Sequence, residues 1–221
     1  MAGSTKIPAA VVLRLSRYHC FLGELEGSLH PGRIRSREIA EELGLSEETV
    51  RHDLSYIDNE GRPGAGYDSQ TLLAALQDFL DLSTEHPFIA IGNRDILAGL
   101  SMTFPAEAFG LRAVGYFSDR SEDVGQTVTG LEIHPASEIP VLARSLGVTI
   151  ALVACEPGSV DETLEILSGS GVNGVLLLTP VLRPKHPEGM TVTYFRIPCA
   201  LKSLVSAEGA TRTCCHAVGC A

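Results

Sequence analysis

The sequence predicts an α/β protein in which an N-terminal winged helix precedes a C-terminal Rossmann-like, doubly wound parallel sheet. Three observations lead to this prediction. The chain has 221 residues, which suits one or two domains. Roughly the first 80 residues show helical apolar spacing and short turns, and after them short runs rich in Val and Ile alternate with helical segments. We expect a helical domain over 1–80, a linker over 81–87, a sheet domain with a C-terminal helix over 88–205, and a tail over 206–221.

The first helix is predicted over Ala9–Leu25, because apolar side chains recur there at roughly helical spacing. Cys20 falls within this spacing, so we expect it in the core. The apolar positions are Val12, Leu15, Cys20, Leu22 and Leu25.

A helix-turn-helix is predicted next. Ser36 is expected to cap a helix that continues to Leu43, and Gly44 supplies the turn after it. Ser46 is expected to cap the third helix, Glu47–Asp58, whose first-turn glutamates suit the helix dipole. A short helix, a glycine turn and a capped second helix are typical of this motif.

A wing and a fourth helix complete the first domain. The segment Gly61–Tyr67 contains three glycines and a proline, too many for a helix, and predicts the tip of a β-hairpin. The fourth helix is expected over Thr71–Leu80 and leads into the linker.

The second domain is predicted to alternate buried strands with helices, the pattern of a parallel sheet covered on both faces. The expected strands are Phe88–Ile91, Leu111–Phe117, Val148–Ala154, Val175–Leu178 and Thr191–Phe195. The expected helices are Asp95–Ser101, Ser137–Leu146, Ser159–Leu167 and Ala200–Ala207.

Composition excludes several classes of protein. A formal net charge of −10 argues against a protein that coats nucleic acid by bulk charge, so any DNA contact must be local. With no Trp and 5% aromatic residues, the chain lacks the stacking platforms of a single-strand binder. No run approaches the roughly 20 apolar residues of a membrane span, and no secretion signal is evident. We expect a soluble cytoplasmic protein with no membrane partner.

Cations gather locally in the first domain, although residues 1–84 carry a net charge of −5. Arg35 and Arg37 lie at the start of the second helix, where backbone amides and guanidinium groups can hold a phosphate together. Arg51 and His52 are expected to project from the third helix, the presumed recognition helix. We expect Asp53 to orient Arg51 or a neighbouring cation. The alternative is that these arginines only solvate the helices or dock them on the second domain.

Specific motifs then point to a family. They are Lys6-Ile7-Pro8, Arg14-Leu15, Tyr18, Val50-Arg51-His52-Asp53-Leu54-Ser55-Tyr56 and Gly61-Arg62-Pro63-Gly64-Ala65-Gly66-Tyr67. The chain resembles the Rex family of redox-sensing transcriptional repressors, most strongly over residues 6–80 and in pattern and strand order over 87–205. The resemblance implies a homodimer on a palindromic double-stranded operator, a sheet domain that senses the NADH/NAD ratio, and a C-terminal helix exchanged between subunits. The predicted DNA contacts, or supports of contacts, are Lys6, Arg14, Arg35, Arg37, Thr49, Arg51, His52, Ser55, Tyr56, Arg62 and Gly64.

The dinucleotide motif is degenerate in this chain. A Rossmann site uses Gly-x-Gly-x-x-Gly, but the matching stretch is Gly92-Asn93-Arg94-Asp95-Ile96-Leu97, with only the first glycine retained. The acidic residue expected for the adenosine ribose falls on Ser118, with Asp119 one place late. Two further family positions fall on Leu177 and Arg196. We therefore expect NAD(H) binding to be weak or lost, and poor alignment of a divergent domain is the alternative.

The cysteines offer another sensing chemistry. Four of the six, Cys199, Cys214, Cys215 and Cys220, lie in the last 23 residues, together with His216. Thiolate and imidazole are ligands for zinc or an iron–sulfur cluster, and Cys155 is a further possible ligand. The spacing does not match a standard zinc pair, so a thiol switch and an incidental tail stay open, as does a purely hydrophobic role for Cys155.

These predictions combine into one hypothesis: a DNA-binding repressor of the Rex type that responds to redox state through metal, a cluster or thiols at its Cys-rich C-terminus, and not mainly through NADH. An ordinary NADH/NAD-sensing Rex repressor is the first alternative, and a binding module for protein partners is another. A small Rossmann-fold enzyme is less favoured, because the chain has no Ser/His/Asp order, no Tyr-x-x-x-Lys and no P-loop. We expect no enzymatic activity.

Overall fold

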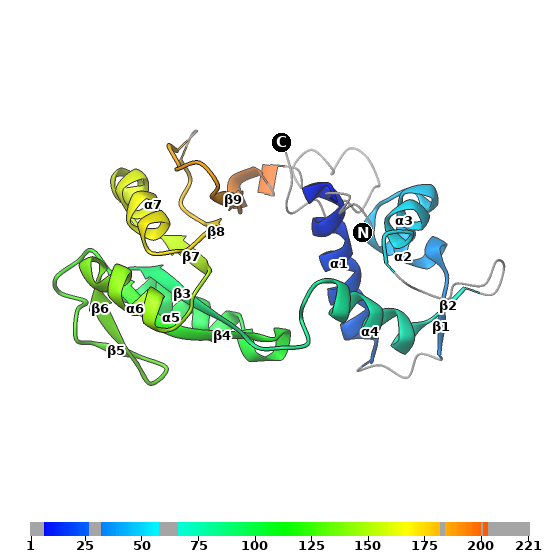
Figure 1. Ribbon diagram of the computed structural model, residues 1–221, viewed down its shortest axis with the longest axis horizontal. Coiled ribbons are helices and arrows are strands. Elements are labelled where there is room, and N and C mark those ends of the chain that lie inside the picture. The colour runs from blue at the N-terminus through cyan, green and yellow to red at the C-terminus, as the bar shows by residue number, and fades with distance from the viewer. Residues whose placement is uncertain (1–6, 27–31, 58–65, 182–183, 200, 203–221) are drawn as a thin grey trace, which may run out of the picture. The chain divides into compact units, whose positions relative to one another are not determined.

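The computed structural model describes residues 7–26, 32–57, 66–181, 184–199 and 201–202. The chain divides into two compact units, with the boundary in the sequence between Thr84 and Glu85 (Figure 1). Each unit is described by itself. Over the ranges given above, no helix is both long enough and apolar enough to cross a membrane.

The first unit is a bundle of four helices with one short pair of strands, as the sequence predicts. α1 uses a face spaced by three and four residues, Val11, Leu15, Tyr18 and Leu22, all at most 4% exposed. Val12 and Cys20 lie outside this face and are exposed, which corrects the expectation that both belong to the core. The helices are α1 (Ala9–Glu26), α2 (Ser36–Leu43), α3 (Glu47–Leu54) and α4 (Ser69–Phe79).

The turn between α2 and α3 forms at Gly44, which has φ +66° and closes α2 in the left-handed region. Ser36 does not cap α2, contrary to the prediction. It is the first helical residue, 7% exposed, and its hydroxyl donates to the Glu47 carboxylate at 2.9 Å. The backbone N–H of Arg35 donates to Glu38 at 2.7 Å instead. Ser36 therefore ties α2 to the first turn of α3.

The third helix begins where the sequence predicts and ends earlier. Ser46 caps it, since its hydroxyl oxygen accepts the backbone N–H of Thr49 at 3.1 Å. The helix stops at Leu54, whereas the prediction extends it to Asp58. Ser55 and Tyr56 consequently lie on the turn that follows the helix.

The wing is described at its two strands only. β1 (Arg33–Ile34) and β2 (Tyr67–Asp68) pair antiparallel, with Ile34 opposite Tyr67. Gly66 precedes β2 with φ +74°, and a Cβ there would lie 2.6 Å from the Ile34 carbonyl oxygen. Of the predicted hairpin tip, Gly61–Tyr67, only Gly66 and Tyr67 are among the described residues.

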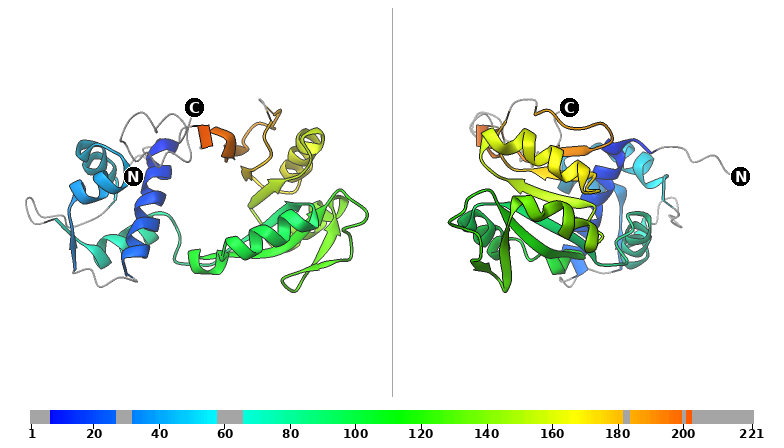
Figure 2. Two further views of the ribbon diagram at one scale, coloured as in Figure 1. Left: turned by 180° about the vertical axis from the view of Figure 1, so that it is seen from behind. Right: turned by 60° about the vertical axis from the view of Figure 1, so that its left-hand side comes forward.

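Figure 2 shows the strands and helices from two further sides. The strands of the second unit form a seven-stranded sheet in the order β5-β6-β4-β3-β7-β8-β9, parallel except for β5. This confirms the Rossmann-like fold class, with strand order reversing between β3 and β7. The strands are β3 (His86–Gly92), β4 (Leu111–Ser118), β5 (Thr127–Val128), β6 (Leu131–Pro135), β7 (Ile150–Ala154), β8 (Gly174–Leu177) and β9 (Thr191–Tyr194). The helices are α5 (Arg94–Thr103), α6 (Ile139–Ser145) and α7 (Val160–Gly169), with short 3-10 turns at Ala106–Phe109, Ala136–Glu138 and Pro157–Ser159.

The sheet buries a different cluster on each face. Side chains such as Ile89, Phe117 and Val153 pack with those of α6 and α7. On the opposite face Ala90 and Tyr116 belong to the cluster that includes Leu97 of α5. Most of the predicted elements are thus present with shifted ends. The helix expected over Ala200–Ala207 falls largely outside the described residues.

The hairpin of β5 and β6 is absent from the sequence-based prediction. These strands have two and five residues and lie at the sheet edge, so no long apolar run marks them. Thr129 and Gly130 join them with φ +46° and +85°. Two successive positive φ values identify a type I′ turn, which favours Asn-Gly.

Replacing Thr129 with Asn is expected to stabilise the second unit. A β-branched residue at positive φ is strained by about 1 kcal/mol, and Asn tolerates this region. The Thr129 hydroxyl contributes one long contact, 3.5 Å from that of Tyr116, so little is lost. Thermal unfolding measures the effect, and Thr127→Asn on the neighbouring strand is the control. A lower melting temperature for Thr129→Asn would contradict this account of the turn.

Candidate functional site

Arg51 lies on the exposed side of α3, at its junction with α2. Its guanidinium forms an ion pair with Glu47 one turn earlier and contacts the Ser36 hydroxyl at 3.4 Å. The Arg51 side chain is 63% exposed. An ion pair at this exposure stabilises a protein by at most about 1 kcal/mol, so a stronger anionic partner can displace Glu47.

The neighbouring polar side chains present a mixed surface. Arg35 and Arg37 are exposed, and Arg37 pairs with Glu41 at 2.6 Å. His52 is exposed and packs edge-on against the ring of Tyr56, with the ring centres 5.4 Å apart. The hydroxyl of Ser55 donates to the His52 carbonyl at 2.6 Å. The α2–α3 junction therefore brings together most of the predicted DNA-contacting residues.

Thr49 has a local partner. Its hydroxyl lies 2.7 Å from that of Ser46, next to the capping bond. Three other predicted contacts, Lys6, Arg62 and Gly64, lie outside the described residues.

Arg14 is held inside the first unit, and this changes its interpretation. Its guanidinium donates to both carboxylate oxygens of Asp53 at 2.6 and 2.7 Å, and the Tyr18 hydroxyl donates to the same carboxylate at 2.7 Å. Asp53 and Tyr18 are both fully buried. Asp53 does not orient Arg51 and instead anchors α3 to α1. We therefore leave Arg14 out of the proposed DNA-contacting surface.

The electrostatics of this cluster follow from burial. Desolvation, followed by the hydrogen bond to Asp53, raises the pKa of Tyr18 far above that of a free tyrosine. The hydrogen bond to Asp53 is also the main cause that raises the pKa of Arg14. Tyr18 consequently stays a neutral donor and Arg14 a cation at physiological pH, which suits a buried carboxylate.

A second region of interest is the carboxyl edge of the parallel sheet, where Rossmann proteins bind ligands. β3 ends at Gly92, where a Cβ would lie 3.2 Å from the Ala154 carbonyl oxygen of β7. Asn93 caps α5, and its side chain accepts the N–H of Ile96 at 2.9 Å. Gly92 thus allows close packing of the strand ends, and Asn93 satisfies one amide of the α5 N-terminus.

An internal carboxylate occupies the same helix terminus. Asp123 is 7% exposed, and its Oδ2 accepts the backbone N–H of Arg94 at 3.2 Å. The same oxygen accepts the hydroxyl of Ser118 at 3.0 Å. The side chain of Arg94 points to Asp95 at 3.3 Å and is 45% exposed.

Asp119 forms a further contact at this edge. Its carboxylate accepts the Ser159 hydroxyl at 2.8 Å, which joins the end of β4 to the turn that precedes α7. That turn follows β7, and β3 lies between β4 and β7 in the sheet order. At this edge, the Asp123 carboxylate and the Asn93 side chain each accept one backbone N–H of the first turn of α5.

The described cysteines do not form a metal centre. Cys155 is buried, its thiol lies 3.7 Å from the Thr163 hydroxyl, and burial raises the pKa of the thiol. Cys199 is exposed. Within the described part of the chain, no group of three His, Cys, Asp or Glu side chains is placed to hold a metal. The other predicted ligands, Cys214, Cys215, His216 and Cys220, lie outside the described residues.

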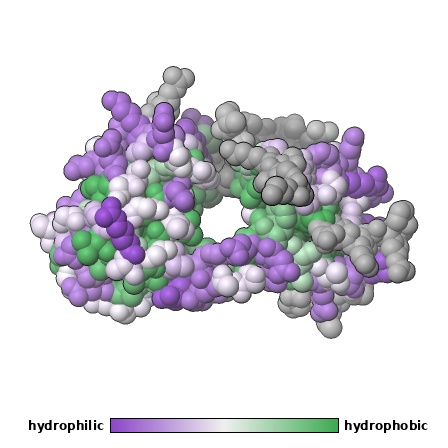
Figure 3. All heavy atoms as spheres, viewed as in Figure 1, coloured by the Kyte–Doolittle hydropathy of each residue, from purple (hydrophilic) through white to green (hydrophobic). Residues whose placement is uncertain are grey.

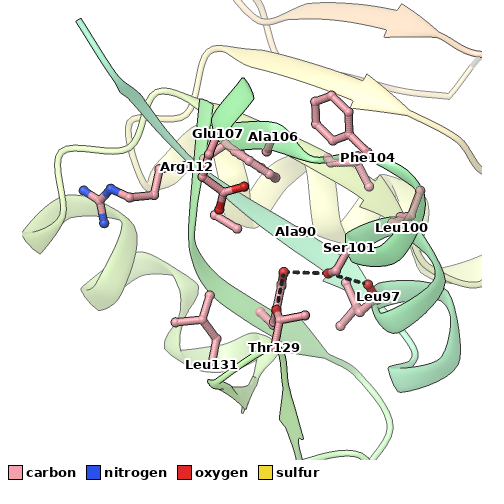
Figure 4. A pocket seen from close by; sticks show the side chains of 14 residues that line it. Ala90, Leu97, Leu100, Ser101, Phe104, Ala106, Glu107, Arg112, Thr129 and Leu131 are labelled. Carbon is pink, nitrogen blue, oxygen red and sulfur yellow. Dashed lines mark hydrogen bonds between the residues drawn. The ribbon is translucent and has the colours of Figure 1, made fainter. Parts of the chain in front are cut away.

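A cavity of about 540 Å³ lies on the α5 side of the sheet (Figure 4). Phe88 and Arg112, near the starts of β3 and β4, help to line it, so it is separate from the carboxyl edge. Its hydroxyls bond to one another: that of Ser101 lies 2.8 Å from that of Tyr116, which lies 3.5 Å from that of Thr129.

Sequence reasoning missed the structural roles of two residues, Asp53 and Asp123. Asp53 was considered only as a partner of a DNA-reading cation, although its position three residues after Val50 places it on the buried side of α3. Asp123 was not singled out at all. One sequence signal could have drawn attention to Asp123. Ser118 replaces the expected acidic residue, and several acidic residues follow in the next loop.

Comparison with known sequences agrees with this arrangement. Residues 6–55 match a family described as "Putative DNA-binding protein N-terminus". The redox-sensing transcriptional repressor Rex of Thermotoga petrophila is 31% identical over 179 residues, which cover 80% of this chain and 85% of that protein. Rex 2 of Enterococcus faecalis is 29% identical over 200 residues, which cover 90% and 92%.

Comparison with solved structures supports the fold of both units. RSP, described as a Rex-family repressor, aligns with a TM-score of 0.78 at 23% identity, over 93% of this chain and 94% of that one. RSP in complex with β-NAD⁺ and operator DNA aligns with a TM-score of 0.78 at 22% identity, over 95% and 100%. A further RSP structure is a complex with β-NADH.

Proposed function

Because the chain belongs to the Rex family of redox-sensing transcriptional repressors, we propose that it binds a palindromic operator as a homodimer through α2, α3 and the wing. The observation that carries this proposal is the helix-turn-helix, which presents exposed Arg35, Arg37 and Arg51 on an otherwise acidic chain. In this proposal α3 enters the major groove.

Arg51 is the proposed base-reading residue. Arg to guanine is the commonest specific pairing in the major groove. Its pair with Glu47 is exposed and weak, so DNA can replace Glu47 as the partner at little cost. In this proposal Glu47 holds the Arg51 guanidinium in position before DNA binds, and Glu47 turns to solvent once DNA is bound.

Arg35 and Arg37 are proposed to contact phosphates. Both lie at the start of α2, where the helix N-terminus adds favourable partial charge. Their contribution is independent of sequence and depends on salt concentration. Thr49, His52, Ser55 and Tyr56 complete the proposed contacting set on and just after α3.

Two apolar side chains of the second unit are strongly exposed. Met102 is 84% exposed and Val141 is 71% exposed. The hydropathy view shows hydrophobic patches among the hydrophilic ones on the face in view (Figure 3). Met102 and Val141 lie on helices that pack on opposite faces of the sheet, so the proposed homodimer rests on the family membership and not on these two side chains.

The effector is proposed to differ from that of RSP, the relative solved with β-NADH. Weak dinucleotide binding is supported by the degenerate glycine loop and by Ser118, which replaces an acidic residue and is 1% exposed. The chain acts as a regulator in this proposal, without enzymatic turnover.

The test is operator binding by Arg51→Ala. Wild-type protein first selects its site from a random library of double-stranded DNA. The variant is expected to bind this site at least about 30-fold more weakly, because the homodimer loses two contacts, each worth about 1–3 kcal/mol. Fluorescence anisotropy measures the affinity, and Arg120→Ala in the second unit is the control. Unchanged affinity for Arg51→Ala would refute its assignment as the base reader.

The same assay separates phosphate contacts from base contacts. Arg37→Ala is expected to weaken binding to all sequences equally and to reduce the salt slope by about two, one for each subunit of the homodimer. If wild-type protein selects no DNA sequence at all, the chain is instead a module that binds protein partners.

A further inference from the structure

We infer that the Asp123 carboxylate occupies the position of a ligand phosphate in the dinucleotide site of this chain. It is an internal anion that binds the N-terminus of α5. The inference rests on the weak dinucleotide binding proposed above and names its cause. A free carboxylate is the chemical counterpart of a ligand phosphate at this position, since both accept backbone N–H groups at a positive helix terminus.

The backbone amides in the first turn of α5 already have hydrogen-bond acceptors within the chain. A Rossmann site holds the pyrophosphate with the N–H groups of this first turn. Here the N–H of Arg94 donates to Asp123 at 3.2 Å, and the N–H of Ile96 donates to the Asn93 side chain at 2.9 Å. Two donors of the turn are therefore satisfied by residues of the chain itself.

The end of β4 holds the Asp123 carboxylate in this position. Ser118 stands where an acidic residue for the ribose is expected, and its hydroxyl donates to Asp123 at 3.0 Å. The N–H of Arg120 donates back to the Ser118 oxygen at 3.1 Å. Asp123 is 7% exposed, so the carboxylate is part of the packed edge of the sheet. Ser118 thus orients the carboxylate that takes the place of a ligand phosphate.

Several carboxylates give this edge of the sheet negative charge, which disfavours a bound pyrophosphate. Asp119, at the end of β4, bonds to Ser159 in the turn after β7, with β3 between these two strands, and Asp95 lies in the first turn of α5. A pyrophosphate would bring negative charge close to these carboxylates and to Asp123. Arg94 is the cation at this turn, and its guanidinium contacts Asp95. A dinucleotide must therefore displace Asp123 and meet further negative charge.

The test is calorimetric titration of NADH and of ADP into the full-length protein and two variants. Asp123→Ala removes the carboxylate and frees the N–H of Arg94, so we expect at least about a tenfold gain in affinity for both ligands, equivalent to about 1.4 kcal/mol. Asp123→Asn keeps the shape and an acceptor oxygen but removes the charge, so we expect a smaller gain in the same direction.

Glu122→Gln is the matched control. Glu122 lies next to Asp123 in sequence, its side chain is 62% exposed, and it pairs with Arg120 at 3.0 Å. It removes one negative charge from the same segment without touching α5, so we expect no gain. An equal gain for Glu122→Gln would mean that overall charge matters and that Asp123 has no specific role.

The remaining outcomes separate this inference from the proposed function. Tight NADH binding by wild-type protein would overturn the proposed weak binding, and the inference with it. Weak binding by wild type and by both folded variants would overturn only the role of Asp123. If Asp123→Ala does not fold, Asp123→Asn decides, and an unchanged affinity there overturns the inference. DNA binding is measured separately and is not affected by any of these results.

Discussion

Replacing Asp53 with Ala is expected to lower the free energy of unfolding of the first unit by about 3–5 kcal/mol, the range for breaking a buried ion pair by removing one partner. For a small helical domain with a stability of about 5 kcal/mol, this change removes most of the stability. Operator binding is expected to be lost with it.

The size of this effect follows from what Asp53 satisfies. Its two oxygens accept both guanidinium bonds of Arg14 and the hydroxyl of Tyr18, at 2.6 to 2.7 Å. Removing the carboxylate leaves the fully buried Tyr18 hydroxyl without its acceptor and Arg14 without its counter-charge. The bond also joins α1 to α3, so its loss frees the recognition helix.

Chemical denaturation of the isolated variant, followed by circular dichroism, measures this prediction. Glu41→Ala is the control, because it breaks the exposed Arg37–Glu41 pair, with side chains 74% and 63% exposed. The control is expected to cost less than about 1 kcal/mol. A loss of comparable size in both variants would show that Asp53 does not act through burial. A double-mutant cycle with Tyr18→Phe would then apportion the energy.

Replacing Gly66 with Ala is expected to destabilise the first unit by about 2–3 kcal/mol and to displace the wing. The residue has φ +74°, and a Cβ would meet the Ile34 carbonyl oxygen at 2.6 Å and its carbon at 3.2 Å. These are backbone atoms of β1, which cannot move without breaking the pair with β2. The pairing of β1 with β2 would then be disturbed.

Gly44→Ala separates the two causes of that effect. Gly44 has φ +66° but open space around its Cβ position, so its replacement reports the cost of the backbone conformation alone, about 1 kcal/mol. The additional loss in Gly66→Ala, measured by thermal unfolding, reports the clash. Operator affinity is expected to fall more for Gly66→Ala at a temperature where both variants are folded. Equal effects at both positions would contradict the clash.

The sequence alone identified the architecture because the architecture depends on local patterns. Neighbouring residues determine the apolar spacing in α1, the Ser46 cap of α3 and the turn at Gly44. The parallel strands are short apolar runs. The edge hairpin of β5 and β6 was missed because strands of two and five residues carry no such pattern. The early end of α3 at Leu54 was missed for a related reason, since helix ends depend on local geometry.

The sites were only partly predictable for a different reason. Sequence places Arg51 on the third helix and shows that the glycine loop is degenerate, because both facts are local. It does not show that Arg14 lies against Asp53, 39 residues away, or that Asp123 reaches the N-terminus of α5, 29 residues from Arg94. Sequence by itself thus determined the family, the fold class and the surface proposed for DNA. Only the tertiary structure decided which charges face solvent and which neutralise one another, because a carboxylate acts on whatever folding brings within hydrogen-bonding distance.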